Sequence, residues 1–226
     1  MATTTASLAE LFEDTPEELR RQALTHSSWT DRRSDAYGRL AFLGDSVLGL
    51  VVASELFTEH PDADIGELTK ILNQAVSGRA CAEVARALGL PDLLRAQAPE
   101  GGTGLPVETL LGSERTMASV CEAVIGACYL VHGYEATATA VTEAFAEEVE
   151  VATRQGLDFK SELQERLARD GATVSYEVVN EAGPPHDRRF EIRATVAGEE
   201  VGTGSGRSKK EAEQSAARRA LESLKR

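Results

Sequence analysis

Residues 40–53 read LAFLGDSVLGLVVA, and Asp45 is the only charged residue in this stretch. A second stretch of the same kind, residues 117–131, reads MASVCEAVIGACYLV, and there Glu122 is the only charged residue. Apolar residues recur at helical spacing in both stretches, so each is predicted to form a core helix. These two helices set the fold of the first part of the chain.

Each lone carboxylate is predicted to lie in apolar surroundings. At about 100° per residue, one face of the first helix carries the apolar residues Leu40, Leu43, Val47 and Leu50. Asp45 lies opposite, beside Phe42 and Gly49, so this helix has no ordinary polar side. An ionised carboxylate is costly in such surroundings unless it is paired, hydrogen-bonded or bound to a cation. One such acid suggests a structural ion pair, but two favour a shared site for a hard divalent cation.

The chain divides into a helical part and a mixed part. Residues 1–152 are predicted to be helical, with apolar periodicity in residues 8–12, 40–51, 71–90 and 107–146, and breaks at Pro61, Pro91, Pro99 and Pro106. Residues 153–157 are the predicted linker. Residues 158–226 show the order α-β-β-β-α, with helices at 159–168 and 208–224 and alternating strands at 174–179, 190–196 and 199–204. The inward stripe of the last helix is predicted to be Ala212, Ala216, Ala220 and Leu224.

The charge is divided as unevenly as the secondary structure. The 226 residues include 24 Lys+Arg and 37 Asp+Glu, a net charge of −13, which by itself argues against nucleic acid as a partner. However, the part before Gln155 holds 24 acidic and 11 basic residues, whereas the part after it is neutral. That neutral part ends in a basic cluster that includes Lys209 and Lys210. The charge therefore predicts two domains with different roles.

Composition also limits the class of protein. A hydrophobic content of 42% and few Pro or Gly clusters exclude a mainly disordered chain. No apolar run is expected to be long enough to span a membrane, and Met1–Ser7 lacks the features of a secretory signal. The three cysteines, Cys81, Cys121 and Cys128, lack metal-site spacing. We therefore expect reduced thiols, a cytoplasmic protein and no membrane partner.

Several motifs together resemble one family. Residues 38–48, GRLAFLGDSVL, are similar to the ribonuclease III signature, which usually reads ERLEFLGDSVL. The resemblance continues in residues 23–28, 67–70 and 118–130, and residues 158–226 resemble a double-stranded RNA-binding domain. It implies an all-α ribonuclease III-like endonuclease domain followed by a small α+β (α-β-β-β-α) double-stranded RNA-binding domain. It also implies a homodimer formed through the helical domain, with Phe42 inserted into the partner subunit.

The resemblance implies a metal site of four acids that binds Mg²⁺, with Mn²⁺ as a substitute. Asp45 and Glu122 match two of these acids and are the expected catalytic and metal-binding residues. Ala41 and Ser119 stand where the other two are expected. Ser119 lies three residues before Glu122, faces the same way, and could hold a metal-bound water. Two carboxylates should bind metal more weakly than four, because the site is nearer −2 than −4.

Two functions follow and stay open at this point. One is a Mg²⁺-dependent endonuclease that cleaves double-stranded RNA in the processing of ribosomal or messenger RNA precursors. The other is a catalytically weakened or inactive homologue that binds double-stranded RNA without cutting it. His26 with Ser27 and Ser28 suggests a nucleophile pair, but no acid partner is evident, so we interpret these residues as packing where a helix begins.

The RNA-binding residues are expected on the second domain. Ser208 and Glu211 are predicted to form a capping box, which places Lys209 and Lys210 in the first turn of the last helix. The helix dipole disfavours cations there, so these lysines favour a role in binding phosphate. By resemblance, the loop with His186 enters a groove of the duplex, and Gln164 and Glu165 make a second groove contact.

Overall fold

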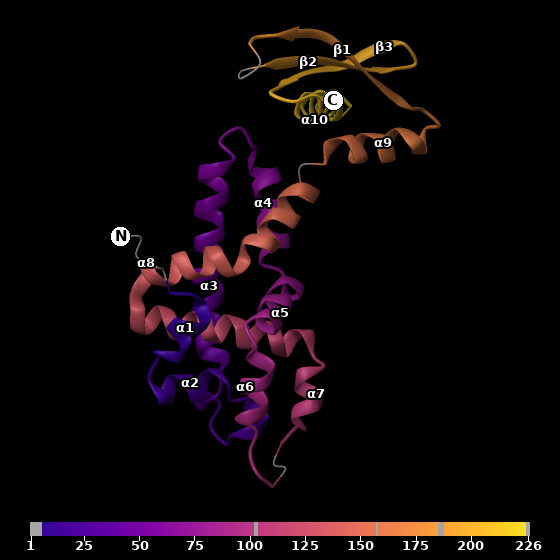
Figure 1. Ribbon diagram of the computed structural model, residues 1–226. Helices are drawn as coiled ribbons and strands as arrows, with labels where there is room; N and C mark the ends of the chain where they lie inside the picture. The colour runs from indigo at the N-terminus through magenta and orange to yellow at the C-terminus, as the bar shows by residue number, and fades with distance from the viewer. Residues whose placement is uncertain (1–5, 102–103, 157, 185–187, 225–226) are drawn as a thin grey trace. The chain divides into compact units, whose positions relative to one another are not determined.

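The computed structural model describes residues 6–101, 104–156, 158–184 and 188–224, so His186 lies outside the described residues. The chain falls into two compact units, Met1–Thr153 and Arg154–Arg226 (Figure 1). The boundary lies at the start of the predicted 153–157 linker. Helix α8 (Glu114–Gly156) continues to Gly156, so residues 153–156 of the predicted linker are helical.

The described residues of the first unit are helical, as predicted, without strands. Its α-helices are α1 (Leu8–Glu13), α2 (Glu17–Ala23), α3 (Gly38–Glu59), α4 (Ile65–Ala75), α5 (Gly78–Ala87), α6 (Leu90–Ala96), α7 (Val107–Leu111) and α8 (Glu114–Gly156). Two short 3₁₀ helices, η1 (Ser27–Trp29) and η2 (Arg33–Asp35), lie between α2 and α3. Helices α3 and α4 pack against one another and run in opposite directions (Figure 1).

Two of the predicted helix boundaries are wrong, for local reasons. The predicted helix 71–90 is divided into α4 and α5, because the Ser77 side chain accepts a hydrogen bond from the Ala80 N–H and begins a new helix. Pro91 does not end a helix but lies in the first turn of α6. Proline is tolerated there because its missing N–H would have no partner in the helix.

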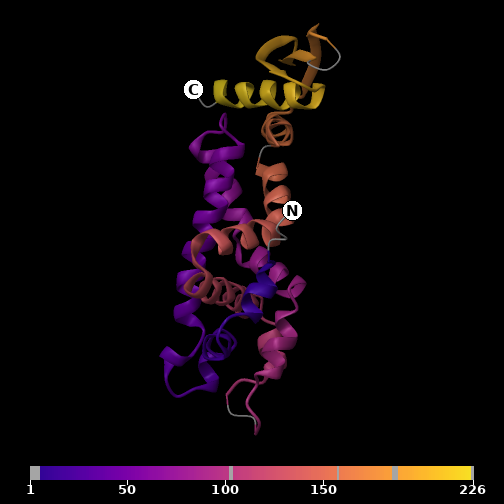
Figure 2. The same cartoon turned by 60° about the vertical axis from the view of Figure 1, so that its left-hand side comes forward.

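Helix α8 is interrupted by a turn at Gly133. Gly133 has φ 74° and ψ −177°, a backbone conformation that favours glycine, and the chain turns back on itself between the two halves of α8 (Figures 1 and 2). Next to it, His132 Nε2 donates a hydrogen bond of 2.9 Å to the Leu11 carbonyl oxygen, which attaches α1 to the turn. The predicted helix 107–146 is therefore interrupted, first between α7 and α8 and again at Gly133.

The core of this unit is built around α3 and the first half of α8. Leu48, Val52, Met117 and Ile125 are fully buried.

The expectation that no apolar run could span a membrane is wrong by length and composition, since Gly38–Glu59 and Glu114–Arg169 both contain a window that is long and apolar enough to cross one. Those windows are 44% and 61% buried inside the structure, and the core helix of a soluble protein passes the same test.

The second unit has the predicted α-β-β-β-α order. It consists of α9 (Phe159–Arg169), β1 (Val174–Ala182), β2 (Arg189–Val196), β3 (Glu199–Gly206) and α10 (Lys209–Ser223). The strands form an antiparallel sheet in the order β1-β2-β3. Helix α10 packs on β2 and β3, and α9 packs on α10 (Figure 1). The alanines of the predicted inward stripe are fully buried, but Leu224 is 39% exposed because it lies just beyond the end of α10.

Candidate active site

Helices α3 and α8 cross with their backbones in direct contact. A Cβ atom on Gly44 would lie 1.7 Å from the Glu122 carbonyl oxygen, and one on Gly126 would lie 2.2 Å from the Leu40 carbonyl oxygen. Both distances are far below van der Waals contact, so the crossing requires glycine at both positions. The crossing brings Asp45, which follows Gly44 on α3, close to Glu122 on α8.

The two carboxylates lie in different surroundings. Glu122 is half-buried, and its pKa is raised to about 7 by burial first and then by the negative charge of Asp45. Asp45 is exposed, so the prediction that both acids lie in apolar surroundings is wrong for Asp45. Phe42, which the helical spacing places beside Asp45, is 79% exposed, and Leu50 on the other face is 55% exposed. Leu50 is therefore not buried with Leu40 and Val47, although the helical spacing places all three on one face.

The remaining positions of the expected acid set carry no charge. Ser119 is half-buried one turn before Glu122, and Ala41 is buried one turn before Asp45. Among the residues that the structure describes, no three His, Cys, Asp or Glu side chains form a metal-binding group. The pair fits a hard cation that keeps most of its water, because two neighbouring carboxylates supply oxygen ligands of the kind that such a cation prefers but only a few of them. It does not fit an ion enclosed by protein ligands.

Two neighbours of the pair were not predicted from the sequence. Burial, and then Glu122 and Asp45, raise the pKa of the Cys81 thiol to about 12, so it stays protonated and is a poor metal ligand. The Tyr37 side chain is hydrogen-bonded to Thr116, which ties the start of α3 to the first turn of α8. Only the helical spacing of Tyr37, Ala41 and Asp45 could have pointed to Tyr37.

The raised pKa of Glu122 gives a testable pH dependence. Between pH 4.5, the ordinary pKa of a glutamate, and about pH 7, Glu122 is protonated in the folded protein but ionised in the unfolded chain. The resulting stabilisation of the folded state is fully present below pH 4.5 and is lost as the pH rises through 7. After allowance for solvent screening, we expect wild-type protein in EDTA to lose about 1–2 kcal/mol more stability than Glu122→Gln between pH 5 and pH 8. Urea unfolding of both proteins measures this difference, and equal pH dependence would contradict it.

The predicted lysine pair lies at the start of α10. Lys209 and Lys210 are exposed in the first turn, and the Lys209 Nζ lies 5.8 Å from the centroid of the Phe190 ring. The Ser208 hydroxyl accepts the Glu211 N–H at 3.1 Å, as predicted. The Glu211 carboxylate, however, accepts the N–H of Arg207 at 2.7 Å, one residue before the predicted partner. The start of the helix is therefore fixed, and neither ammonium group forms an ion pair with a described residue, so both can meet an anion.

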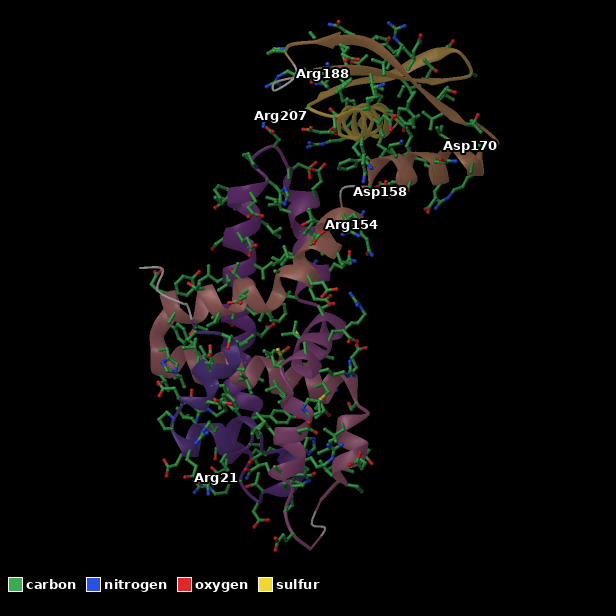
Figure 3. The ribbon with its side chains drawn as sticks, viewed as in Figure 1. Arg21, Arg154, Asp158, Asp170, Arg188 and Arg207 are labelled. Carbon is green, nitrogen blue, oxygen red and sulfur yellow. The ribbon has the colours of Figure 1, made fainter. Side chains whose placement is uncertain are left out.

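Gln164 and Glu165, the other predicted RNA contacts within the described residues, are exposed on α9. Asp158 caps the start of α9 and Asp170 follows its end (Figure 3). Asp158 Oδ1 also accepts a hydrogen bond of 3.0 Å from Gln214 Nε2 on α10. The two helices that carry the predicted RNA-binding residues are thus held together by polar contacts.

The His26 segment has a structural role, as interpreted from the sequence. The Ser28 hydroxyl donates to His26 Nδ1 at 2.8 Å, and the same oxygen accepts the Leu105 N–H at 3.0 Å. The Trp29 Nε1–H donates to the Leu105 carbonyl oxygen at 2.9 Å. Because the Ser28 hydroxyl is used both as donor and as acceptor, it ties the connection before α7 to η1 and is not a free nucleophile.

Comparison with known proteins agrees with the two units. The Ribonuclease-III-like family matches residues 16–149, and the Double-stranded RNA binding motif matches residues 159–224. The chain belongs to the ribonuclease III family. This ribonuclease III family member is 44% identical to Ribonuclease 3 of Symbiobacterium thermophilum over 218 aligned residues. The alignment covers 93% of this chain and 89% of the relative. It is 42% identical to Ribonuclease 3 of Streptomyces coelicolor, over 90% of this chain and 74% of the relative.

Solved structures show the same fold. The ribonuclease III nuclease domain from Campylobacter jejuni aligns with a TM-score of 0.51 and 28% identity, over 62% of this chain and 96% of that domain. Dicer from Pichia stipitis aligns with a TM-score of 0.54 and 24% identity over 92% of this chain and 93% of that chain, which supports the fold alone. Family, domain order and fold together make this protein a double-stranded RNA-specific endoribonuclease of the ribonuclease III type. Members of the family generally depend on a divalent metal.

Proposed function

We propose that Asp45 and Glu122 together bind one Mg²⁺, for which Mn²⁺ can substitute, and that this pair is the catalytic centre. The observation that carries the proposal is the contact between α3 and α8, which places two carboxylates so close that Asp45 raises the pKa of Glu122. A bound divalent cation would activate water and neutralise charge on the scissile phosphate. We further propose that the protein acts in the cytoplasm on ribosomal or messenger RNA precursors.

The chain's own groups have separate roles in this proposal. Asp45, being exposed, faces incoming RNA, whereas half-buried Glu122 holds the inner side of the site. The Ser119 hydroxyl, one turn from Glu122, holds a water molecule beside the pair. Tyr37 and Thr116 keep α3 and α8 in register, so that the two carboxylates stay together.

The missing acids favour a specific alternative, namely a catalytically weakened or inactive homologue that acts by binding double-stranded RNA. A cleavage assay separates the two functions. Purified full-length protein is incubated with long duplex RNA in Mg²⁺, in Mn²⁺ and in EDTA, and products are resolved on a denaturing gel. We expect cleavage with either metal and none in EDTA. Tight duplex binding with no products at any metal concentration would instead support the alternative.

RNA binding is proposed for Lys209, Lys210, Gln164 and Glu165, together with His186, which lies outside the described residues. The double variant Lys209→Ala/Lys210→Ala is expected to bind duplex RNA about tenfold more weakly and to lower the salt slope by about 1–2, because two phosphate contacts are lost. Fluorescence anisotropy at several salt concentrations measures both. Arg193→Ala is the control, since it removes a charge that is already paired with Glu200 on the sheet. An unchanged salt slope in the lysine variant would refute the assignment.

A homodimer through the helical unit is proposed from the exposed apolar surface of α3. Phe42 is 79% exposed and borders a hollow of about 560 Å³, whose other walls include Leu19, Leu43 and Leu130. A hollow of this size beside a protruding aromatic ring is suited to a reciprocal contact with a second copy. The ribonuclease III nuclease domain from Campylobacter jejuni likewise has a region involved in dimer formation.

Phe42→Ser is expected to weaken dimerisation at least about tenfold, because a buried aromatic contact is typically worth more than 1.4 kcal/mol. Sedimentation equilibrium of the full chain measures the dissociation constant. Phe57→Ser is the matched control, since Phe57 is 74% exposed on the same helix but does not line the hollow. Equal effects of the two substitutions would contradict a specific role for Phe42.

A further inference from the structure

A cavity of about 610 Å³ opens on the helical unit and shares no residue with the Asp45–Glu122 site. This volume lies within the range of about 300–1,000 Å³ that is usual for small-molecule sites. The cavity lies between α2, the η1–η2 segment and the residues that follow α6. Its walls are mainly polar: Glu18, Arg21, Gln22, Thr25, Trp29, Thr30, Ser34, Asp35, Gln97 and Pro99.

Free positive charge lies in and beside this cavity. Arg21 is exposed in its wall and lies at the outer surface of the helical unit (Figure 3). Arg32 and Arg33 are exposed in the segment between Thr30 and Ser34. Within the described part of the chain, none of these three arginines makes an ion pair, although the first part of the chain carries 24 acidic against 11 basic residues. An unpaired guanidinium in an acidic unit is suited to bind a phosphate.

An aromatic ring is fixed in the same wall. Trp29 Nε1–H donates to the Leu105 carbonyl oxygen at 2.9 Å, and its ring packs edge-on against His26, with centroids 6.2 Å apart. A half-buried, hydrogen-bonded indole provides a rigid surface on which a base can stack, an interaction typically worth about 1–3 kcal/mol.

The two carboxylates of the wall narrow the choice of ligand. Glu18 and Asp35 would repel a bare phosphate or the continuous phosphate backbone of a duplex. They can accept hydrogen bonds from the hydroxyls of a ribose, as acidic residues do in dinucleotide sites. The Gln97 side chain adds an amide that can meet the polar edge of a base.

We propose that this cavity binds a single unpaired ribonucleotide, with its base on Trp29, its phosphate on Arg21 and its ribose hydroxyls on Glu18 and Asp35. The ribonucleotide comes either from a free nucleotide or from the unpaired end of an RNA strand. The second source rests on the proposed action on RNA, whereas the first does not.

Trp29 is the only tryptophan in the chain, so its fluorescence reports on the cavity directly. Full-length protein in EDTA, excited selectively at tryptophan, is titrated with AMP, UMP or inorganic phosphate. In parallel it is titrated with duplex RNA that is blunt or carries a two-nucleotide 3′ overhang. We expect saturable quenching by a mononucleotide, by the overhang duplex or by both, and none by phosphate or blunt duplex. Arg21→Ala should weaken this binding at least about tenfold, since a charge-assisted hydrogen bond to phosphate is lost.

The control is Arg86→Ala, which removes the same charge from an exposed position of the same unit where the guanidinium is paired with Glu83 at 3.0 Å. It should bind like the wild type. Quenching by a mononucleotide assigns a free nucleotide as the ligand, and quenching by the overhang duplex assigns a strand end. No response to either, a response to phosphate or blunt duplex as strong as to a nucleotide, or an unchanged affinity of Arg21→Ala would overturn the proposal. Because EDTA prevents metal binding, these outcomes do not depend on whether Asp45 and Glu122 are catalytic.

Discussion

Asp45→Asn/Glu122→Gln is expected to lower the rate of duplex RNA cleavage at least about 10³-fold, because loss of the metal removes several kcal/mol of transition-state stabilisation. Binding of duplex RNA should stay within about twofold of the wild type, because the proposed RNA contacts lie on the second unit. Single-turnover cleavage with excess enzyme and anisotropy in EDTA measure the two quantities separately.

The control for this variant is Glu83→Gln, which removes a negative charge from an exposed residue of α5 that is paired with Arg86. It should cleave at the wild-type rate. If the double variant kept cleavage within about threefold of the wild type, Asp45 and Glu122 would not be the catalytic pair. A simultaneous loss of binding would mean that the substitutions act through the fold rather than through the metal.

Gly44→Ala is expected to destabilise the protein by about 3 kcal/mol or more and to abolish cleavage. Its Cβ atom would meet the Glu122 carbonyl oxygen at 1.7 Å, so the backbones of α3 and α8 would have to separate. Overpacking against a side chain typically costs about 1–3 kcal/mol, and a backbone atom cannot move aside as a side chain does. Urea unfolding followed by circular dichroism measures the change.

The matched control is Gly49→Ala on the same helix, where a Cβ atom would meet nothing within 4 Å. This substitution should stabilise the protein by up to about 1 kcal/mol, because alanine is the better helix former. The two changes add the same methyl group to the same helix, so opposite signs would isolate the helix crossing as the cause. A similar, small effect at both positions would show that α3 and α8 do not require the close contact.

Secondary structure was the part of the fold best predicted from local pattern. The helical unit, the α-β-β-β-α unit and the capping role of Ser208 follow from periodicity and from side chains within a few residues. Errors occurred where a single helix cap or a single backbone angle decides whether a helix continues, as at Ser77 and Gly133. These choices involve differences of about 1 kcal/mol, which an apolar pattern that continues across them does not reveal.

The sequence pointed to the residues of the candidate site but not to the surroundings in which they lie. Asp45 and Glu122 were singled out because each is the only charge in an apolar helix, and α3 and α8 bring them together. The exposure of Asp45 and Phe42 was not predictable, because the same apolar composition describes a face buried in the chain and a face left open. Periodicity gives the direction of a side chain, but it does not show what covers it.

The sequence by itself determined the family and the order of the two domains, and it pointed to the two acids and the two lysines as candidate site residues, because these depend on residue identity and on spacing within one helix. Only the tertiary structure decided that Gly44 and Gly126 set the distance between α3 and α8, and that Trp29, Arg21 and Asp35 line one cavity. Contacts such as that between Trp29 and Leu105 join residues 76 positions apart. Their geometry results from the packing of whole helices against one another, which no local stretch of sequence contains.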